Sequence, residues 1–262
     1  MTLFVVGTGP GSTDHMSRHA IEVIKSVDCV AGYTPYIELI SALTRGKQII
    51  STGMMKEVER VEKAVDCALQ GKSCALISGG DPGIYAMAGL VFEICRERKV
   101  NLYRFNNMMQ APSKKDSLAI EIIPGIPALA AGAALLGAPL THDFAAISLS
   151  DLLTPWKKIE TRLGLVAKAD FVIVLYNPKS RKRDWQLKKA QQIILKHRPE
   201  DTPVGIVTGA MRDNQQVAFS SLGKLNNVAV GMQTIVFIGS SASIQYLDFL
   251  FTPRGYAEKY NI

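Results

Sequence analysis

The chain has 262 residues, 47% of them hydrophobic, and carries 30 Lys and Arg against 23 Asp and Glu, for a net charge of +7. This length can fill one large core or two smaller ones, and two domains of ordinary size are the expected division. The positive charge favours a polyanionic partner, such as a nucleic acid, a phosphorylated compound or a polycarboxylate, without distinguishing among them.

The first half alternates short β-branched runs with helical patterns, which is typical of a parallel sheet covered by helices. In the helix expected after Lys56, apolar residues recur at three- and four-residue spacing and predict one buried face. These predicted core residues are Val58, Val61, Val65, Ala68 and Leu69. The expected strands are Leu3–Gly7, Asp28–Gly32, Gln48–Ser51, Ser73–Ser78 and Ala119–Ile123, with helices near Met16–Lys25, after Pro35 and over Lys56–Gly71.

The second half has four apolar runs that follow one another more closely in places, which favours a mixed sheet in a separate α/β domain. The runs are Phe171–Asn177, Pro203–Gly209, Gln216–Ser221 and Gln233–Gly239. We therefore expect an α/β fold with two domains, residues 1–123 and 124–262. A polar stretch, Phe105–Ser117, interrupts the first half and is expected to be a surface loop.

Neither a membrane nor a protein-built metal site is expected. The most apolar stretch, Ile126–Leu140, contains two prolines and is too short to cross a bilayer, and the amino terminus enters a strand at once. Cytoplasm is the expected location. The cysteines Cys29, Cys67, Cys74 and Cys95 lie far apart in the sequence and form no Cys-x-x-Cys pair, so buried free thiols are the expected state.

Three glycine and proline loops follow three expected strands: "GTGPGS" from Gly7, "GGDPGIY" from Gly79 and "PGIPALAAG" from Pro124. Carboxyl ends of parallel strands lie along one edge of an open sheet, where ligands bind. Glycine permits close backbone approach and proline stiffens a turn. The sequence therefore predicts that the three loops meet at this edge and form a rigid wall against a flat ligand.

The acid in the second loop, Asp81, limits the choice of ligand. A carboxylate would repel a nucleotide phosphate, and the dinucleotide fingerprint fails because Ser12 stands where its third glycine belongs. The acid expected at the end of the second strand is missing, and no Gly-Lys-Ser/Thr follows the glycines. A cationic or zwitterionic ligand such as S-adenosylmethionine suits a carboxylate and a row of backbone amides.

The motifs "VVGTGPGS", "SGGDPGIY", "IIPGIPALAAGAALLGAPLTHD", "VLYNPKS" and "VTGAMRD" occur in the order seen in the tetrapyrrole methylases, and the chain resembles this family over nearly its whole length. "AGYTPYIELI" and "YNPKSRKR" resemble its precorrin-3B or cobalt-factor III C17-methyltransferase branch, which methylates the macrocycle and contracts it. Tyr33 and Met54 stand where uroporphyrinogen methylases have Asp and Lys, which disfavours that activity.

The resemblance implies two α/β domains with S-adenosylmethionine in a cleft between them, a corrin-type macrocycle as substrate and a homodimer. Neither a membrane nor a protein-bound metal is implied. The cofactor contacts that it implies are Pro10, Gly79, Gly80, Asp81, Ile84, Pro127, Ala128, Tyr176, Asn177, Gly209 and Thr234.

The substrate and proton-transfer residues are hypotheses from position and chemistry. Cations at a helix start oppose the helix dipole, so Lys179, Arg181 and Arg183 are candidates for binding macrocycle carboxylates. Methyl transfer needs positioning and no covalent nucleophile, whereas ring contraction needs a proton-transfer group. Tyr33 at a strand end is the first candidate for that group, followed by His142 and Asp14.

Two other functions stay open at this stage. One is methylation of a different macrocycle carbon by a protein of the same fold. The other is RNA binding or modification, suggested by the +7 charge. The chain has no recognisable RNA-binding module, and its basic residues are not interleaved with stacking aromatics. We therefore expect no nucleic-acid partner.

Overall fold

The computed structural model describes the chain except for residues 107–116, 181–182 and 261–262. The described chain forms two compact units, Met1–Pro127 and Ala128–Ile262. This division falls a few residues after the expected boundary, so the whole "IIPGIP" segment belongs to the first unit. Most of the polar stretch expected as a loop lies outside the described residues, but Ser117 begins a strand and Phe105 packs edge-on against Phe4, with ring centroids 5.1 Å apart.

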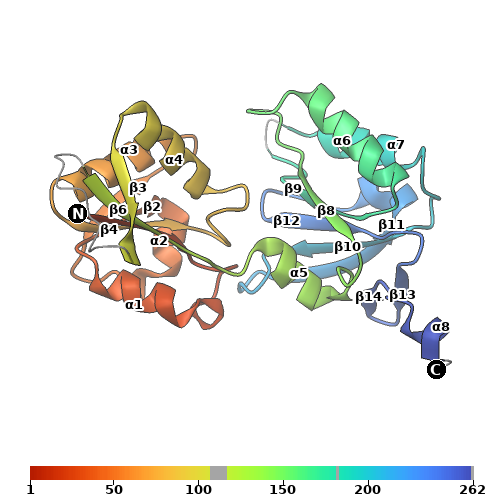
Figure 1. Cartoon of the computed structure of the whole chain (residues 1–262). Helices are drawn as coiled ribbons and strands as arrows, with labels where there is room; N and C mark the ends of the chain where they lie inside the picture. Colours follow the sequence, from red (N-terminus) through yellow and green to blue (C-terminus); the bar gives the residue numbers. More distant parts are fainter. Residues whose placement is uncertain (107–116, 181–182, 261–262) are drawn as a thin grey trace. The chain divides into compact units, whose positions relative to one another are not determined.

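The first unit contains a parallel sheet in the order β3-β2-β4-β1-β6-β5, as the alternating pattern predicted. Figure 1 shows α3 and α4 on one face of this sheet and α1 and α2 on the other. The strands are β1 Thr2–Gly7, β2 Cys29–Tyr33, β3 Gln48–Thr52, β4 Ser73–Ser78, β5 Asn101–Arg104 and β6 Ser117–Ile123. The helices are α1 Arg18–Ser26, α2 Thr34–Leu39, α3 Glu57–Leu69 and α4 Met87–Glu97, with short 3₁₀ turns η1 Thr13–His15 and η2 Ser41–Leu43.

The apolar stripe of α3 packs on the sheet with one exception. Val61, Val65 and Ala68 are fully buried, but Val58 is 53% exposed. The prediction that Val58 is a core residue was wrong because it lies in the first turn, and the buried stripe runs instead through Arg60 and Ala64.

The second unit contains a mixed sheet, again as predicted, in the order β11-β10-β12-β9-β8. Helices α6 and α7 cover one face and α5 covers the other. The strands of this sheet are β8 Phe144–Ser148, β9 Val172–Tyr176, β10 Pro203–Thr208, β11 Gln216–Ser221 and β12 Thr234–Ile238. The helices are α5 Ala128–Leu136, α6 Trp156–Lys168, α7 Gln186–Ile194 and the 3₁₀ helix η4 Leu222–Asn227.

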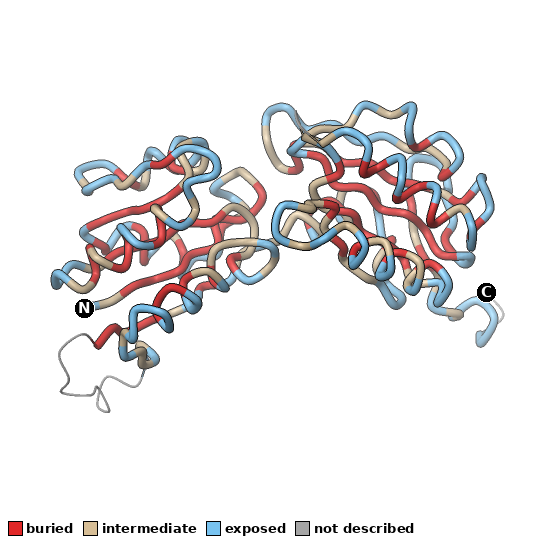
Figure 2. The backbone as a smooth tube through the Cα atoms, turned by 90° about the horizontal axis from the view of Figure 1, so that it is seen from above, coloured by how far each residue is buried: buried red, intermediate tan, exposed pale blue. Residues whose placement is uncertain are grey.

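A small sheet in the order β13-β14-β7 adjoins the C-terminal helix of this unit. Its strands are β13 Ile244–Tyr246, β14 Phe249–Phe251 and β7 Gly137–Ala138, and the helix is α8 Tyr256–Tyr260. In each unit the buried residues gather on the central strands and on the inward faces of the helices (Figure 2). None of the helices in the described ranges has both the length and the apolar character to cross a membrane.

Candidate functional site

The three glycine loops meet at the carboxyl edge of the first sheet, which confirms the prediction from the sequence. Strands β4, β1 and β6 are neighbours, so their carboxyl ends lie side by side. The first two loops are joined by a pair of backbone hydrogen bonds, Gly9 N to Gly80 O at 3.2 Å and Gly80 N to Gly9 O at 2.7 Å. Both glycines have positive φ, +69° and +68°, a conformation that favours glycine.

The third loop approaches the other two so closely that side chains are excluded. A Cβ atom on Gly125 would lie 2.2 Å from the carbonyl oxygen of Gly80, and one on Gly7 would lie 2.6 Å from the amide nitrogen of Gly125. The glycines are therefore required by the packing of backbone on backbone. The predicted residues Pro10, Ile84 and Pro127 belong to these same loops, with Pro10 buried and the other two partly buried.

Asp81 has a structural role that the sequence did not reveal. Its Oδ1 accepts a hydrogen bond from Gly83 N at 2.8 Å, and its Oδ2 accepts one from Gly125 N at 3.1 Å. The carboxylate thus ties the second loop to the third. These two contacts explain why the glycine loop contains an acid, and the explanation does not require a ligand. A charged carboxylate accepts stronger hydrogen bonds from backbone amides than a neutral acceptor does.

Tyr33 ends β2 and lies beside the second glycine loop. Its ring packs edge-on against Tyr36, with centroids 5.4 Å apart, and a Cβ atom on Gly79 would lie 2.7 Å from the ring of Tyr36. The two aromatic rings therefore connect the end of β2 to the loop that contains Gly79. Within the described part of the chain, the hydroxyl group of Tyr33 has no hydrogen-bond partner.

A buried arginine lies beneath this aromatic pair. Arg60 is 3% exposed; its Nε donates to Thr52 Oγ1 at 2.7 Å and its Nη2 to Gly53 O at 3.0 Å. Its guanidinium carbon lies 5.7 Å from the centroid of the Tyr33 ring, within the range of a cation–π contact. Burial lowers the pKa of Arg60, but an arginine still keeps its charge near neutral pH.

Arg60 is not among the residues predicted from the sequence. The signal was present, because a charged residue stands in the apolar stripe of α3 next to Val61 and Ala64. Among the described residues, no carboxylate lies within ion-pair distance of Arg60. A buried cation with neutral partners therefore lies at the same sheet edge as the glycine loops.

In the second unit, the predicted cofactor residues gather along one edge of the mixed sheet. Ser148 and Tyr176 are paired at the ends of β8 and β9. The hydroxyl of Tyr176 accepts a hydrogen bond from Leu129 N at 3.0 Å, next to Ala128 in the first turn of α5. Asn177 adopts positive φ, +52°, and its Nδ2 donates to Ser148 Oγ at 2.9 Å.

Thr234 and Gly209 lie at this same edge, because β10 and β12 are antiparallel and pair Thr208 with Thr234. The hydroxyl oxygens of these threonines are 2.8 Å apart. Gly209 has φ +59°, and its amide donates to Gln233 O at 3.0 Å. The structure thus brings together within the second unit the five residues predicted there, namely Ala128, Tyr176, Asn177, Gly209 and Thr234.

His142 does not belong to this group. It precedes β8 by two residues, and the carbonyl of the adjacent Asp143 accepts a hydrogen bond from Val172 N at the start of β9. Tyr176 ends β9, so four residues of strand, about 13 Å, separate the two positions. His142 lies at the amino end of β8, contrary to the expectation that it faces the predicted site.

Asp14 lies on η1, directly after the first glycine loop, and its side chain is exposed. The neighbouring His15 has a buried Nδ1 that finds no hydrogen-bond partner among the described residues. A buried ring nitrogen without a partner is uncommon in folded proteins. His15 therefore joins Asp14 as a proton-transfer candidate at this position.

The three basic residues after β9 differ in their surroundings. Lys179 is exposed, whereas Arg183 is partly buried and donates from Nη1 to Asn177 O at 3.2 Å and to Leu149 O at 3.3 Å. Arg183 therefore holds the loop after β9 in place, a role that the sequence did not indicate. Arg181 lies outside the described residues.

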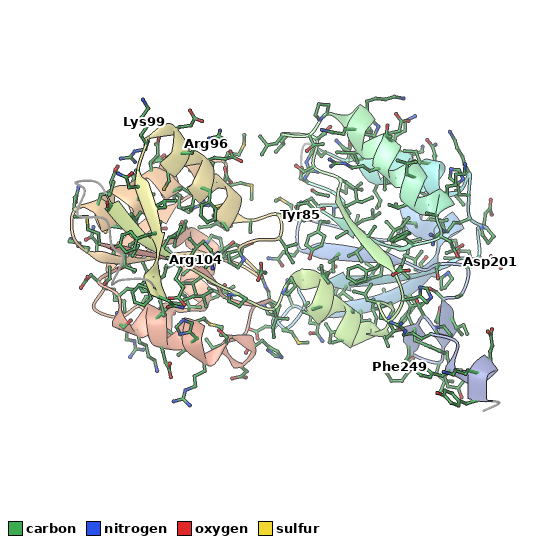
Figure 3. The ribbon with its side chains drawn as sticks, in the orientation of Figure 1. Tyr85, Arg96, Lys99, Arg104, Asp201 and Phe249 are labelled. Atoms are coloured by element: carbon green, nitrogen blue, oxygen red, sulfur yellow. The ribbon has the colours of Figure 1, made fainter. Side chains whose placement is uncertain are left out.

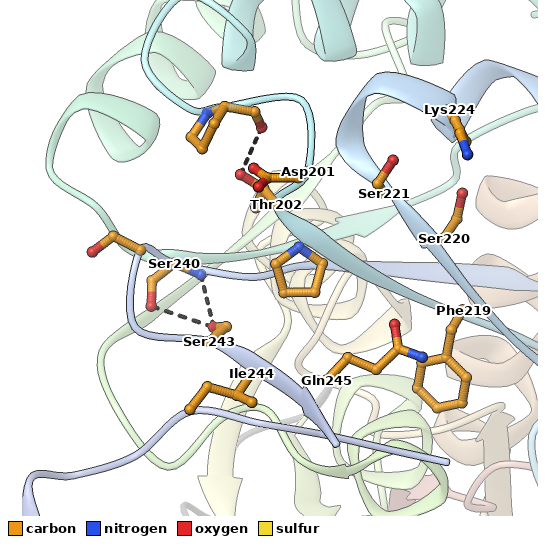
Figure 4. Close-up of a pocket in the computed structure, with 13 residues that line it drawn as sticks. Asp201, Thr202, Phe219, Ser220, Ser221, Lys224, Ser240, Ser243, Ile244 and Gln245 are labelled. Atoms are coloured by element: carbon orange, nitrogen blue, oxygen red, sulfur yellow. Dashed lines mark hydrogen bonds between the residues drawn. The ribbon is translucent and has the colours of Figure 1, made fainter. Parts of the chain in front are cut away.

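A pocket in the second unit lies away from every predicted site residue. It has a volume of about 760 Å³, and Figure 4 shows Thr202, Ser220, Lys224 and Ser243 among the residues that line it. It lies near the start of β10, at Pro203, whereas Gly209 follows the end of that strand. Because Ser243 already bonds to Ser240 and Thr252 within the fold, the hydroxyls do not by themselves indicate a ligand.

Three cysteines that are far apart in the sequence come together in the first unit. Their Sγ atoms, those of Cys29, Cys67 and Cys74, all lie within 4.8 Å of one another. Hydrogen bonding from Cys74 lowers the pKa of Cys29 to about 7, and burial raises the pKa of Cys67 to about 11. The expectation of buried free thiols is confirmed, but the sequence did not predict that these three lie together, which they do because β2 and β4 are neighbours in the sheet.

Known proteins resemble this chain over nearly its whole length. The model of the tetrapyrrole (corrin/porphyrin) methylases matches residues 2–226. A cobalt-factor III methyltransferase of Priestia megaterium is 46% identical over 260 residues, 99% of this chain and 46% of that protein. The chain thus spans about half the length of this relative.

Two further matches cover nearly the whole of this chain and nearly the whole of the matched chain. A probable cobalt-factor III C(17)-methyltransferase of Salmonella typhimurium is 41% identical over 254 residues, 97% of this chain and 99% of that protein. The crystal structure of the methyltransferase CobJ superposes with a TM-score of 0.83 at 29% identity, covering 96% of this chain and 99% of that one.

The fold, the glycine loops and these matches show that the chain belongs to the tetrapyrrole (corrin/porphyrin) methylase family. As a member, it is an S-adenosylmethionine-dependent methyltransferase, which confirms the resemblance seen in the motifs. The Priestia megaterium relative is named a cobalt-factor III methyltransferase and the Salmonella typhimurium relative a probable cobalt-factor III C(17)-methyltransferase, the branch that the sequence indicated.

Proposed function

We propose that this methyltransferase methylates C17 of a corrin precursor and contracts its ring, in the biosynthesis of cobalamin. The names of the two relatives favour cobalt-factor III as the substrate, with metal-free precorrin-3B as the alternative. Any cobalt then arrives inside the macrocycle, and the protein needs no metal ligand for it. Identity of 41% across the whole length of both chains is the observation that carries this proposal.

The residues of both units fit S-adenosylmethionine. In the first unit, the loops around Gly9, Gly80 and Gly125 present a backbone surface with no room for side chains. In the second unit, the edge that holds Ala128, Tyr176, Asn177, Gly209 and Thr234 offers hydroxyl and backbone groups. We assign the predicted cofactor contacts of the first unit to its glycine loops and those of the second unit to this sheet edge.

S-adenosylmethionine supplies an electrophilic methyl group, and the protein supplies position and proton transfer. Glycine loops made rigid by Asp81 hold the reactants in fixed orientation, which is a large source of acceleration in a two-reactant step. Ring contraction also moves a proton, and the unpartnered hydroxyl of Tyr33 is available to donate or accept it. Arg60 and Tyr36 fix the orientation of the Tyr33 ring.

The direct test incubates the protein with S-adenosylmethionine and with each of the two macrocycles under anaerobic conditions. We expect one methyl group to be added to cobalt-factor III and the absorption of a contracted ring to appear. Product mass and absorption measure the two steps separately. Methylation at another carbon, or no reaction with either macrocycle, would contradict the proposal, and binding of labelled RNA would favour the alternative of RNA binding or modification.

Lys179 is the described basic residue best suited to bind a substrate carboxylate, because it is exposed and follows the edge that holds Asn177. We expect Lys179→Ala to raise the Michaelis constant for the macrocycle about 10- to 100-fold, equivalent to about 1.5–3 kcal/mol for a charged hydrogen bond. Cofactor affinity should stay the same. Lys188→Ala, an exposed lysine on α7, is the matched control. Equal kinetics for the two variants would remove Lys179 from the substrate site.

The proposal includes a homodimer. Four apolar side chains at the β13–β14 hairpin are 45–72% exposed, namely Ile244, Tyr246, Leu247 and Phe249. Figure 3 shows Phe249 on this hairpin near the C-terminal helix. Such exposed apolar groups are typical of contact surfaces, so we assign the face to a second copy of the chain. Sedimentation should show a dimer that Leu247→Asp weakens, and a monomer at micromolar concentration would refute it.

Cell fractionation tests the expected cytoplasmic location.

A further inference from the structure

The cluster of Cys29, Cys67 and Cys74 has the geometry of a metal site. Cys29 begins β2, Cys74 is its direct partner on β4, and Cys67 reaches them from α3. With their Sγ atoms within 4.8 Å of one another, an ion at the centre of the triangle would lie at most about 2.8 Å from each sulfur (4.8/√3). A shift of about 0.5 Å per side chain then gives a normal metal–sulfur distance of about 2.3 Å.

The ligand atoms and the apolar surroundings of the three cysteines indicate which kind of ion the cluster would bind. All three ligand atoms are sulfur, which binds soft ions, and the cysteines are 0%, 6% and 0% exposed in an apolar core. Within the described residues, no histidine, carboxylate or further cysteine joins the cluster as a fourth ligand. Structural zinc sites are almost always tetrahedral with four protein ligands, so three buried sulfurs match a low-coordinate ion better.

The cluster is separate from the proposed methyltransferase site. Cys29 begins β2 and Tyr33 ends it, so four residues of strand, about 13 Å, lie between them. Residues 70–72 connect α3, which holds Cys67, to β4, which holds Cys74, and they include the exposed Gly71 and Lys72.

We propose that Cys29, Cys67 and Cys74 form a trigonal site for a soft monovalent cation, with Cu(I) as the ion bound. Each coordinating thiol releases its proton to the solvent as a copper–sulfur bond forms, and the copper stays in the +1 state. The bound ion cross-links β2, β4 and α3, so it stabilises the first unit. This site is independent of the methyl transfer reaction.

The test uses the full chain with Cu(I) in competition with a colorimetric Cu(I) chelator under anaerobic conditions. We expect one tightly bound Cu(I) per chain, three sulfur neighbours by X-ray absorption and a higher melting temperature with copper. Zn(II) should bind much more weakly than Cu(I). Tighter binding of Zn(II) would overturn the choice of ion, and no stoichiometric binding of Cu(I) would overturn the site.

Cysteine variants separate this site from nonspecific thiol binding. Cys67→Ser and Cys29→Ala should each weaken Cu(I) binding by about 100-fold or more, because even groups that only orient metal ligands contribute about 10–100-fold. Cys95→Ser is the matched control, since Cys95 is also buried in this core but is not part of the cluster. Circular dichroism checks that each variant is folded. Unchanged affinity in folded Cys67→Ser, or a loss in Cys95→Ser, would refute the assignment.

Discussion

Replacing Gly125 by alanine is expected to reduce the affinity for S-adenosylmethionine by about 100-fold or more, because the three loops of the first unit cannot then meet. The added Cβ would lie 2.2 Å from the carbonyl oxygen of Gly80 and 2.9 Å from the carbonyl carbon of Gly7. Both are backbone atoms, which cannot rotate away. We also expect a loss of about 1–3 kcal/mol in the free energy of unfolding, as in other overpacked interiors.

Isothermal titration calorimetry measures the affinity and urea unfolding measures the stability. Gly89→Ala is the matched control in the same unit, because Gly89 lies in α4 and a Cβ there meets no atom within 4 Å. It should bind the cofactor normally and gain up to about 1 kcal/mol in stability from helix propensity. A Gly125→Ala variant that binds S-adenosylmethionine like the unchanged protein would show that the loop junction is not part of the cofactor site.

Replacing Tyr33 by phenylalanine is expected to separate methylation from ring contraction. The variant keeps the ring that packs on Tyr36 and Arg60 and loses only a hydroxyl, which has no hydrogen-bond partner among the described residues. The fold should therefore be unaffected. If this hydroxyl transfers the proton, contraction slows by about 10²–10⁴-fold while methyl transfer continues.

Mass spectrometry and absorption of the product mixture distinguish the two steps. The Tyr33→Phe variant should consume S-adenosylmethionine and accumulate a methylated macrocycle that has not contracted. Tyr103→Phe serves as the control, because Tyr103 lies on the edge strand β5 of the same sheet, and three strands separate β5 from β2. Contraction at the normal rate in Tyr33→Phe would exclude this hydroxyl and direct attention to Asp14 and His15.

The position of Arg60, which packs against the Tyr33 ring, is visible in the sequence, but its role is clear only from the structure. The apolar spacing of α3 was sufficient to predict its buried face, yet Arg60 occupies that face and Val58 does not. Periodicity reports which side of a helix is apolar on average. It does not report that a polar pocket, formed here by Thr52 and Gly53, receives one charged side chain.

The fold class, the parallel and mixed sheets and the convergence of three glycine loops could all be predicted from the sequence. Strand and helix periods, turn residues and motif order are local properties, and the parallel sheet then places loop ends on one edge. The five cofactor residues predicted in the second unit also lie together, whereas His142 lies apart from them. The prediction for His142 was wrong because the sequence does not show which residues share an end of the sheet. His142 precedes β8, whereas Tyr176 ends the parallel strand β9, so the two residues lie at opposite ends.

The role of Asp81, the loop contacts of Arg183 and the cluster of three cysteines depend on contacts between residues 6 to 45 positions apart. Cys29 and Cys74 are neighbours because β2 pairs with β4, and Asp81 reaches Gly125 because β4, β1 and β6 are adjacent. Strand order arises from the packing of the whole unit, since each pairing is stabilised by burial on both faces of the sheet. A single sequence contains no local pattern that specifies this order, so these features became visible only in the folded chain.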